Sequence, residues 1–561
     1  MLVTDDQLKQ LVVKTGLADA KKLEEIKSFA ENANIGFDEA IIDKDIASDE
    51  QLGLLIADFL KIPFVVLSKI TIPEDVFRII PERLARKQKV IAFAQDGKGV
   101  RVAMTNPKNT ELLSLLARKV GKNVSAYLAT ERDIYNTLHI YRKELQKTFD
   151  QMLKEELEKK GNLLFDTAPA AKIVDLLIDY AYQDKASDIH IEPEEKHSLA
   201  RFRIDGIMHD ILILPKALHD QIITRIKVQS RLRTDEHLSP QDGKMRMKLA
   251  EEDFDIRVSI IPVAEGEKAV LRLLVSRFRK FSLLDLGMND EDLKKVTAAI
   301  NKSYGMILST GPTGSGKTTS IYSILKILNT REKNITTIED PIEYRIRGVN
   351  QIQTNTKTNL TFATGLRSIL RQDPNIIFVG EIRDSETAGI AVNAALTGHL
   401  VLSTLHTNDA ATALPRLIDM KIEPFLVAST VNIIIAQRLV RKICEMCKTS
   451  VIFTRKDLLR RLPEDIIKKH FNEKEEIRAY YGKGCKICHS TGYAGRVGIF
   501  EILVVSKEIR RLITEKVDSD IIEKAAISEG MNTMLDDGLM KVAKGQTTIE
   551  EAFRATKVEI L

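Results

Sequence analysis

The sequence predicts a multidomain α/β protein, and three observations lead to this class. The chain has 561 residues, which at about 100–200 residues per domain makes three or four folded units. Hydrophobic residues make up 44% of it and charged residues 29%, so disordered, collagen-like and disulfide-scaffold classes are excluded. From about residue 283 to the end, apolar runs alternate with helical stretches, as is typical of parallel α/β units.

The first segment, residues 1–145, alternates short helical patterns with two strand-like runs at residues 89–94 and 99–104. An aspartate-glycine turn signal separates the two runs, so this segment is predicted to be a small α/β domain. Residues 146–165 interleave lysine and glutamate in a helical pattern. They are predicted to form a solvated helical linker.

The second segment, residues 166–281, begins with an amphipathic helical pattern. Four strand-like runs follow it, at residues 188–192, 201–206, 254–259 and 269–274. Helix followed by alternating strands predicts an α+β domain with an antiparallel sheet. The third segment, residues 283–561, is the predicted parallel α/β part.

Charge and cysteine content bear on location and partners. The 84 basic side chains exceed the 79 acidic ones by only five, so composition gives no argument for nucleic acid or anionic lipid. The N-terminus carries acids where a secretory signal would carry lysine, and the longest uncharged stretch, residues 387–408, holds too many polar side chains for a membrane span. Four cysteines in so long a chain suggest the cytosol.

A glycine-rich loop between a strand-like run and a helical run predicts a nucleotide site. The loop has the spacing G-x-x-x-x-G-K-[ST], in which glycines let backbone N–H groups converge on phosphate oxygens and the helix N-terminus adds positive dipole. The Lys317 ammonium would serve the β- and γ-phosphates and the Thr318 hydroxyl Mg²⁺. The alternative is a glycine-rich turn that binds nothing. The predicted nucleotide-binding residues are Gly311, Pro312, Thr313, Gly314, Ser315, Gly316, Lys317, Thr318 and Thr319.

Two acid-ended runs downstream are candidates for holding the metal and activating water. The first, residues 335–344, is rich in β-formers and ends in Glu339, Asp340 and Glu343. The second, residues 375–384, has Glu381 after four apolar residues and a glycine. Such a run is most often only a strand meeting solvent, but two of them after a phosphate loop favour a metal and water site. Glu339 and Asp340 join the predicted nucleotide-binding set.

Two histidines, His399 and His406, flank an apolar strand-like run. Both could therefore lie at strand ends near the phosphates. The pair is predicted to sense the γ-phosphate and to signal its hydrolysis to the rest of the chain. Structural histidines with satisfied hydrogen bonds are the alternative.

Together these stretches resemble the secretion ATPases of type IV pilus assembly and type II secretion. They match the Walker A, Asp box, Walker B and His box of that family at residues 311–319, 337–343, 379–384 and 397–408. Further matches lie at residues 187–193, 201–206, 240–243, 436–440 and 495–501. The resemblance covers about residues 170–555.

The resemblance implies a RecA-like ATPase domain at residues 283–561, preceded by a PAS-like domain at residues 166–281. It also implies hydrolysis in a homohexameric ring, each site lying between the RecA-like domain of one subunit and the second domain of its neighbour. Arginines from that neighbour would stabilise charge on the transferred phosphoryl group. The candidates are Arg203 and Arg225, with Arg257 and Arg272 behind them. This chain departs from its relatives at residues 237–238, where His-Leu replaces a pair of arginines.

Catalytic roles follow from the same resemblance. We favour Glu343 as the base that activates water, with Glu381 linked to Mg²⁺ through water. Lys317 contacts phosphate, and His399 and His406 report its state.

The four cysteines form two C-x-x-C pairs, Cys444 with Cys447 and Cys485 with Cys488, separated by 37 residues. Four thiolates suit a closed tetrahedral Zn²⁺ site with no open position for chemistry, so the zinc would be structural. A redox dithiol or buried free cysteines are the alternatives, and neither explains why no cysteine lies elsewhere. The resemblance agrees, because assembly and secretion ATPases typically carry this insertion, here residues 441–500.

Through residues 51–64 and 79–85, the segment 1–145 resembles the N-terminal domain of the same assembly ATPases, which implies docking to a membrane-associated partner. In some relatives this domain binds cyclic di-GMP through an Arg-Leu-Gly repeat. The corresponding stretch here is Asn34-Ile-Gly36, which lacks the arginine. Binding of cyclic di-GMP is therefore predicted to be unlikely.

The sequence thus predicts a homohexameric, Mg²⁺-dependent ATPase that drives pilin polymerisation by moving an inner-membrane platform protein. We expect it in the cytoplasm, held at the inner face of the membrane through that protein and a cytoplasmic assembly partner. A type II secretion ATPase is the nearest alternative. A RecA-like nucleic-acid motor is disfavoured because aromatic residues make up only 5% of the chain and tryptophan is absent. A non-hydrolysing scaffold is disfavoured by the intact loop lysine and both acid runs.

Overall fold

The computed structural model divides into two compact units. The first comprises Met1–Val76, Lys89–Ile134 and Arg279–Leu561, and the second comprises Phe77–Gln88 and Tyr135–Phe278. The described residues are 2–33, 36–44, 46–70, 72–97, 99–138, 149, 168–248, 253–275, 282–459, 464–471, 476–485 and 488–556. The linker predicted at residues 146–165 lies outside them except for Phe149. Helices and strands mix in both units, which confirms the predicted α/β class.

The N-terminal part of the first unit contains four helices and a three-stranded sheet. The helices are α1 (Asp5–Lys14), α2 (Ala20–Ala33), α3 (Phe37–Asp43) and α4 (Asp49–Leu60). The sheet has the order β1 (Val90–Asp96), β2 (Gly99–Met104) and β3 (Val124–Leu128). Both predicted strand runs are strands here, β1 and β2. The other helices in this stretch of chain are α5 (Glu74–Phe77), α6 (Glu82–Gln88), α7 (Thr110–Val120) and α8 (Glu131–Thr137), of which α6 falls within the second unit.

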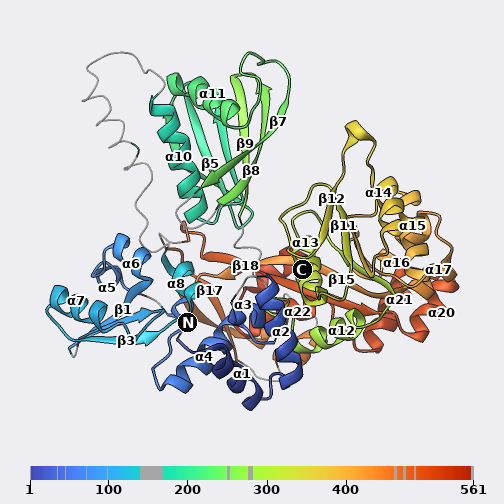
Figure 1. Cartoon of the computed structure of the whole chain (residues 1–561), viewed down its shortest axis with the longest axis horizontal. Coiled ribbons are helices and arrows are strands. Elements are labelled where there is room, and N and C mark those ends of the chain that lie inside the picture. Colours follow the sequence, from blue (N-terminus) through green and yellow to red (C-terminus); the bar gives the residue numbers. More distant parts are fainter. Residues whose placement is uncertain are drawn as a thin grey trace. The chain divides into compact units, whose positions relative to one another are not determined.

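The second unit is built on a six-stranded antiparallel sheet, drawn in green in Figure 1. The strand order is β6 (Ile207–Pro215), β5 (His197–Ile204), β4 (Asp188–Pro193), β9 (Gly266–Leu274), β8 (Asp253–Val263) and β7 (Gln241–Lys248). Buried residues alternate with less buried ones along β5 and β8, so one face of the sheet is buried. That face packs in one core with helices α10 (Ala168–Gln183) and α11 (His219–Gln229).

The C-terminal part of the first unit is built on a seven-stranded sheet. Its order is β12 (Asn350–Gln353), β11 (Ile335–Glu339), β13 (Ile376–Val379), β14 (Leu400–Leu405), β10 (Gly305–Thr310), β15 (Val431–Ile443) and β18 (Tyr493–Val504). Neighbouring strands are parallel except β18, which runs antiparallel to β15. Every residue of β10, β11, β13 and β14 is buried, as expected of parallel strands covered on both faces.

Helices cover this sheet on both faces. They are α12 (Asp290–Ile300), α13 (Lys317–Leu328), α14 (Phe362–Ile369), α15 (Ser385–Leu396), α16 (Ala413–Asp419), α17 (Pro424–Thr430), α20 (Lys507–Thr514), α21 (Ser519–Ser528), α22 (Met534–Ala543) and α23 (Ile549–Thr556). Buried apolar side chains form two cores, one with α12 and α13 and the other with α14 to α17. Strand β15 contributes Ile433 and Ile435 to the first core and Ile434 and Ala436 to the second.

An insertion separates β15 from β18. It contains an antiparallel pair, β16 (Lys448–Thr454) and β17 (Glu476–Gly482), and the short helices α18 (Arg455–Leu459) and α19 (Glu464–Phe471). The two cysteine pairs lie where the chain enters and leaves this pair of strands. Within the described part of the chain, no helix combines the length and the apolar character needed to cross a bilayer.

Candidate nucleotide site

The glycine-rich loop connects the buried strand β10 to helix α13, so the strand, loop and helix order that the motif requires is present. Gly311 and Gly316 have φ of 143° and 92°, a region that favours glycine. A Cβ on Gly311 would lie 2.4 Å from the carbonyl oxygen of Gln437, and one on Gly316 2.6 Å from the Gln437 Nε2. Only glycine fits at these two positions against strand β15.

Lys317 is the first residue of α13 and is buried. Its Nζ donates to the carbonyl oxygens of Gly311 at 2.7 Å and Pro312 at 3.2 Å. Burial lowers the pKa of Lys317, and the nearby Glu381 carboxylate opposes that shift. The ammonium therefore lies in the loop where an incoming phosphate could replace the two carbonyl acceptors.

Glu381 and His406 lie at the same edge of the sheet as the loop. Glu381 follows β13 and His406 follows β14. Strand β14 lies between β13 and β10, and all three strands are parallel. The His406 Nε2 is 3.1 Å from the Glu381 Oε2, while Arg383 Nη2 is 2.7 Å from Oε1. The structure thus brings Lys317, Glu381 and His406 together, as the sequence predicts for these three.

The first acid run is arranged differently. Glu339 is only 2% exposed; its carboxylate accepts hydrogen bonds from Tyr322 of α13, from Thr337 and, at 3.1 Å, from the Gln351 amide. Burial raises the pKa of Glu339 against these hydrogen bonds. The side chain is thus an interior hydrogen-bond acceptor rather than a free carboxylate at the loop.

Asp340 and Glu343 follow Glu339 on the connection to β12. Asp340 is exposed and Glu343 is half-buried. The Glu343 carboxylate lies close enough to raise the pKa of Glu339. A half-buried acid beside the sheet edge suits a base that must reach a water molecule.

His399 lies away from the other predicted site residues. It precedes β14, and its carbonyl oxygen accepts from the N–H of Gly305, the first residue of β10. Its Nδ1 is 2.9 Å from the carbonyl oxygen of Ala394. Because β10 and β14 are parallel, His399 is at the edge opposite to the loop. Within one chain, the two histidines therefore lie at opposite ends of β14, and only His406 is at the end that carries the loop, so the expectation that both flank the phosphates fails for His399.

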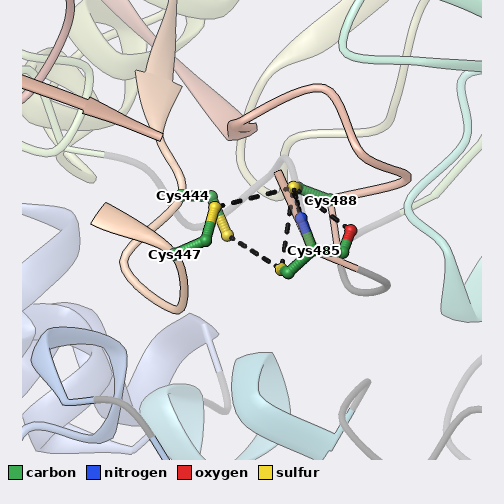
Figure 2. A group of neighbouring side chains, drawn as sticks. All are labelled: Cys444, Cys447, Cys485 and Cys488. Carbon is green, nitrogen blue, oxygen red and sulfur yellow. Dashed lines mark hydrogen bonds between the residues drawn. The ribbon is translucent and has the colours of Figure 1, made fainter. Parts of the chain in front are cut away.

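The four cysteines come together from the two ends of the insertion (Figure 2). All four Sγ atoms lie within 4.8 Å of one another, and the pairs 444–485, 447–488 and 485–488 are 3.9, 3.9 and 3.7 Å apart. Four sulfurs held about 2.3 Å from a tetrahedral Zn²⁺ are about 3.8 Å apart, whereas a disulfide needs about 2.05 Å. The spacing fits a metal site and no disulfide.

The environment of the thiols differs from one to the next. Burial raises the pKa of Cys447 to about 11 and raises that of Cys444 further. Burial also acts on Cys488, but backbone N–H groups of Cys485 and Gly492 donate to its Sγ and lower its pKa overall. Four thiolates at this spacing would repel one another, and a divalent cation between them would offset that repulsion.

The model of a family described as Type II/IV secretion system protein matches residues 164–554. The chain belongs to this family. A second model, the MshEN domain, matches residues 60–146.

Relatives of this secretion family align with most of the chain. The type IV pilus assembly ATPase PilB of Myxococcus xanthus is 36% identical over 97% of this chain and 98% of its own. The type II secretion system protein E of Pseudomonas aeruginosa is 40% identical over 84% of this chain and 90% of its own. The ATPase DotB of Legionella pneumophila, a solved structure, shares the fold with a TM-score of 0.51 at 22% identity, covering 68% of this chain and 94% of that one. Family and phosphate loop together identify the chain as an ATP-hydrolysing enzyme of a pilus or secretion system.

The predicted arginines of this secretion ATPase lie in the second unit. Arg203 of β5 and Arg272 of β9 flank β4 and both reach the buried Asp188, with Nε to carboxylate oxygen distances of 3.6 and 2.8 Å. Arg225 lies on α11, and its Nε is buried with no hydrogen-bond partner among the described residues. Asp188 therefore orients two of the candidates.

Sequence reasoning gave no role to Gln437, which the structure puts against the loop. Its side chain is 1% exposed, Oε1 accepts from Ser320 of α13 at 2.6 Å, and Nε2 faces Gly316 with no hydrogen-bond partner in the described structure. The motif at residues 436–440 was the available signal. It could not show that β15 lies beside β10 with Ala436 level with Thr310.

Proposed function

We propose that this chain is the Mg²⁺-dependent ATPase that powers type IV pilus assembly. One observation carries the choice of pilus assembly: the relative that aligns with 97% of the chain, including its N-terminal region, is named a type IV pilus assembly ATPase. The named type II secretion relative aligns with 84%. Type II secretion, supported by 40% identity over that part, remains the second candidate.

Each residue of the nucleotide site has a proposed task. The N–H groups of the loop and the Lys317 ammonium bind the phosphates, and the Thr318 hydroxyl and Glu381 hold Mg²⁺, which supplies charge neutralisation for phosphoryl transfer. Glu343 removes a proton from the attacking water. His406, next to Glu381, responds to loss of the γ-phosphate.

The ring supplies the remaining charge. In a homohexamer, Arg203 and Arg225 of a neighbouring subunit would stabilise the transferred phosphoryl group, and Asp188 supports this by orienting Arg203. Closure on ATP and reopening on release would move an inner-membrane platform protein. The chain would work in the cytoplasm at the inner face of the membrane.

The N-terminal domain is proposed to dock a membrane-associated partner without binding cyclic di-GMP. Of the stretch on which that proposal rests, Asn34 and Ile35 lie outside the described residues. Isothermal titration of cyclic di-GMP into the purified chain tests it, and micromolar binding would reject it.

The cysteine site is proposed to hold a structural Zn²⁺. Metal analysis of the purified chain should give one zinc per chain, and Cys485→Ser should lose the zinc and lower the melting temperature. A metal-free chain that melts at the same temperature after chelation would reject the proposal.

Steady-state turnover against protein concentration tests the ATPase proposal. Turnover per chain should need Mg²⁺, rise with concentration as rings form, and vanish in Lys317→Ala. Lys326→Ala, in the last turn of the same helix, is the matched control and should keep wild-type turnover. Turnover that survives in Lys317→Ala would contradict the proposed site. Restoration of surface pili, rather than secretion, in a strain lacking its own ATPase would separate the two candidate systems.

A further inference from the structure

Glu501 is a buried acid that the nucleotide site, as described above, does not use. It lies on β18 opposite Ala436 of β15, and it is only 3% exposed. It is the last residue of the motif at residues 495–501, which is part of the resemblance to the secretion ATPases and to which no role was assigned. A buried carboxylate needs hydrogen-bond donors around it, because an unpaired buried charge is costly.

Its two oxygens accept from two separate segments. Oε1 accepts from the N–H of Ala410 at 2.8 Å, and Oε2 accepts from the N–H of Met534 at 3.4 Å. Met534 is the first residue of α22, where a backbone N–H has no acceptor within the helix and a negative charge is favoured. One side chain thus joins the loop after β14 to the start of α22.

The loop from His406 to Ala410 is the one that carries the site histidine. Near its beginning, the N–H of Thr407 donates to Oγ1 of Thr310, the last residue of β10, at 3.0 Å. At its end, Ala410 is bound by Glu501. His406, which contacts Glu381, therefore lies on a loop with one anchor beside the phosphate loop and another on β18.

Charged side chains of the described residues lie near this carboxylate, among them Asp409 of the loop, Glu523 of α21 and Arg438 of β15. Burial first, and then the two acids, raise the pKa of Glu501 to about 7 despite its N–H donors. An ionised carboxylate accepts both hydrogen bonds, whereas protonation turns one oxygen into a donor that faces an N–H.

We propose that Glu501 is a positioning residue for ATP hydrolysis, whose ionised carboxylate holds the His406–Ala410 loop in place and ties it to helix α22. The inference rests on the proposed ATPase function. In this inference, a side chain remote from the nucleotide controls kcat. The phosphate loop still determines the affinity for ATP.

The test compares the full-length chain with Glu501→Gln and Glu523→Gln over pH 5.5 to 9 at saturating Mg²⁺ and ATP. Wild-type kcat should rise with pH through a midpoint near 7. Glu501→Gln cannot accept both bonds, so its kcat at pH 8.5 should fall by about tenfold or more with KM unchanged, and the rise should disappear. Glu523→Gln removes a facing charge, so its midpoint should shift to lower pH with the plateau unchanged.

Hydrogen exchange of the peptide covering residues 406–412 gives a readout that does not depend on turnover. The amide of Ala410 should exchange faster in Glu501→Gln, with the phosphate-loop peptide unaffected. Loss of turnover in every protein, together with this faster exchange, would reject the ATPase proposal and keep the anchor. Wild-type kcat in Glu501→Gln, a midpoint unmoved in Glu523→Gln, or unchanged exchange would overturn the role of Glu501.

Discussion

Glu339 ends strand β11 and Glu381 follows the neighbouring parallel strand β13, yet the surroundings of the two acids are opposite. Ile338 of β11 is paired with Val379 of β13, so Glu339 is level with Gly380 and Glu381 lies one residue further along. Side chains alternate between the two faces of a strand, and one residue decides where an acid points. Glu339 points into the interior toward Tyr322, while Glu381 meets His406 and Arg383 at the loop. Two similar acid runs therefore hold these two acids in different surroundings.

The largest effect should come from Glu343, the acid of the first run that remains half-buried. Glu343→Gln removes the proposed base, and kcat should fall about 10²–10⁴-fold while ATP still binds. Single-turnover hydrolysis and binding of a fluorescent ATP analogue measure the two quantities. Glu339→Gln, from the same run, is the matched control and should retain most of the turnover. Unchanged hydrolysis in Glu343→Gln would transfer the role of base to Glu381.

Glu381→Gln should have the next largest effect. A metal-linked acid that loses its charge typically costs about 10–100-fold in metal affinity or activity. We expect the Mg²⁺ concentration for half-maximal turnover to rise, with kcat reduced, in a Mg²⁺ titration at fixed ATP. A variant that needs no more Mg²⁺ than the wild type would show that the two acid runs do not divide the work in this way.

Glu339 should affect stability and its pH dependence rather than chemistry. Because its pKa is raised in the folded chain, the folded state binds a proton more readily than the unfolded one, so this contribution to stability falls as pH rises above the unfolded value. The melting temperature of Glu339→Gln, relative to that of the wild type, should therefore increase as the pH is raised from 5 to 8. Tyr322→Phe leaves one acceptor unpaired and should cost about 1–3 kcal/mol. A pH-independent difference would contradict the assignment.

The smallest effect is expected at His399, at the opposite end of β14 from His406. Within a chain, the only hydrogen-bond partners of its imidazole among the described residues are the carbonyl oxygen of Ala394 and the hydroxyl of Thr397. His399→Ala should therefore change kcat by no more than about twofold. His406→Ala removes the imidazole that contacts Glu381, so turnover should no longer depend on that contact. A large loss in His399→Ala, present only at concentrations where rings form, would show that this histidine acts on a neighbouring subunit.

The nucleotide loop and the cysteine site were predictable because their residues are close in sequence or of a rare type. Glycine spacing determines where backbone N–H groups converge, and four cysteines in a chain of 561 residues have few partners to choose from. The α/β class followed equally from the alternation of buried strands and helices, and it is confirmed.

Contacts between strands that are distant in the chain could not be predicted from the sequence. Gln437 and Glu501 lie one residue apart in register on β15 and β18, since Ala436 is opposite Glu501. They point to opposite faces, Gln437 toward the phosphate loop and Glu501 toward the His406 loop. His399 is a second example of what the sequence does not contain. The sequence places a histidine at each end of a strand, but it does not indicate which end lies next to the loop. Register and strand order supply that information.

The insertion leaves the sheet after β15 and returns to it at β18, and the paired cysteines stand where it leaves and returns. With all four thiols bound to one ion, the 37 residues between Cys447 and Cys485 form a closed side loop whose two feet are fixed. Residues could then be added to or removed from that loop without sliding one strand along the other. The bound metal would separate the insertion mechanically from the sheet. A partner that binds or pulls on the insertion would then not displace Gln437 or Glu501.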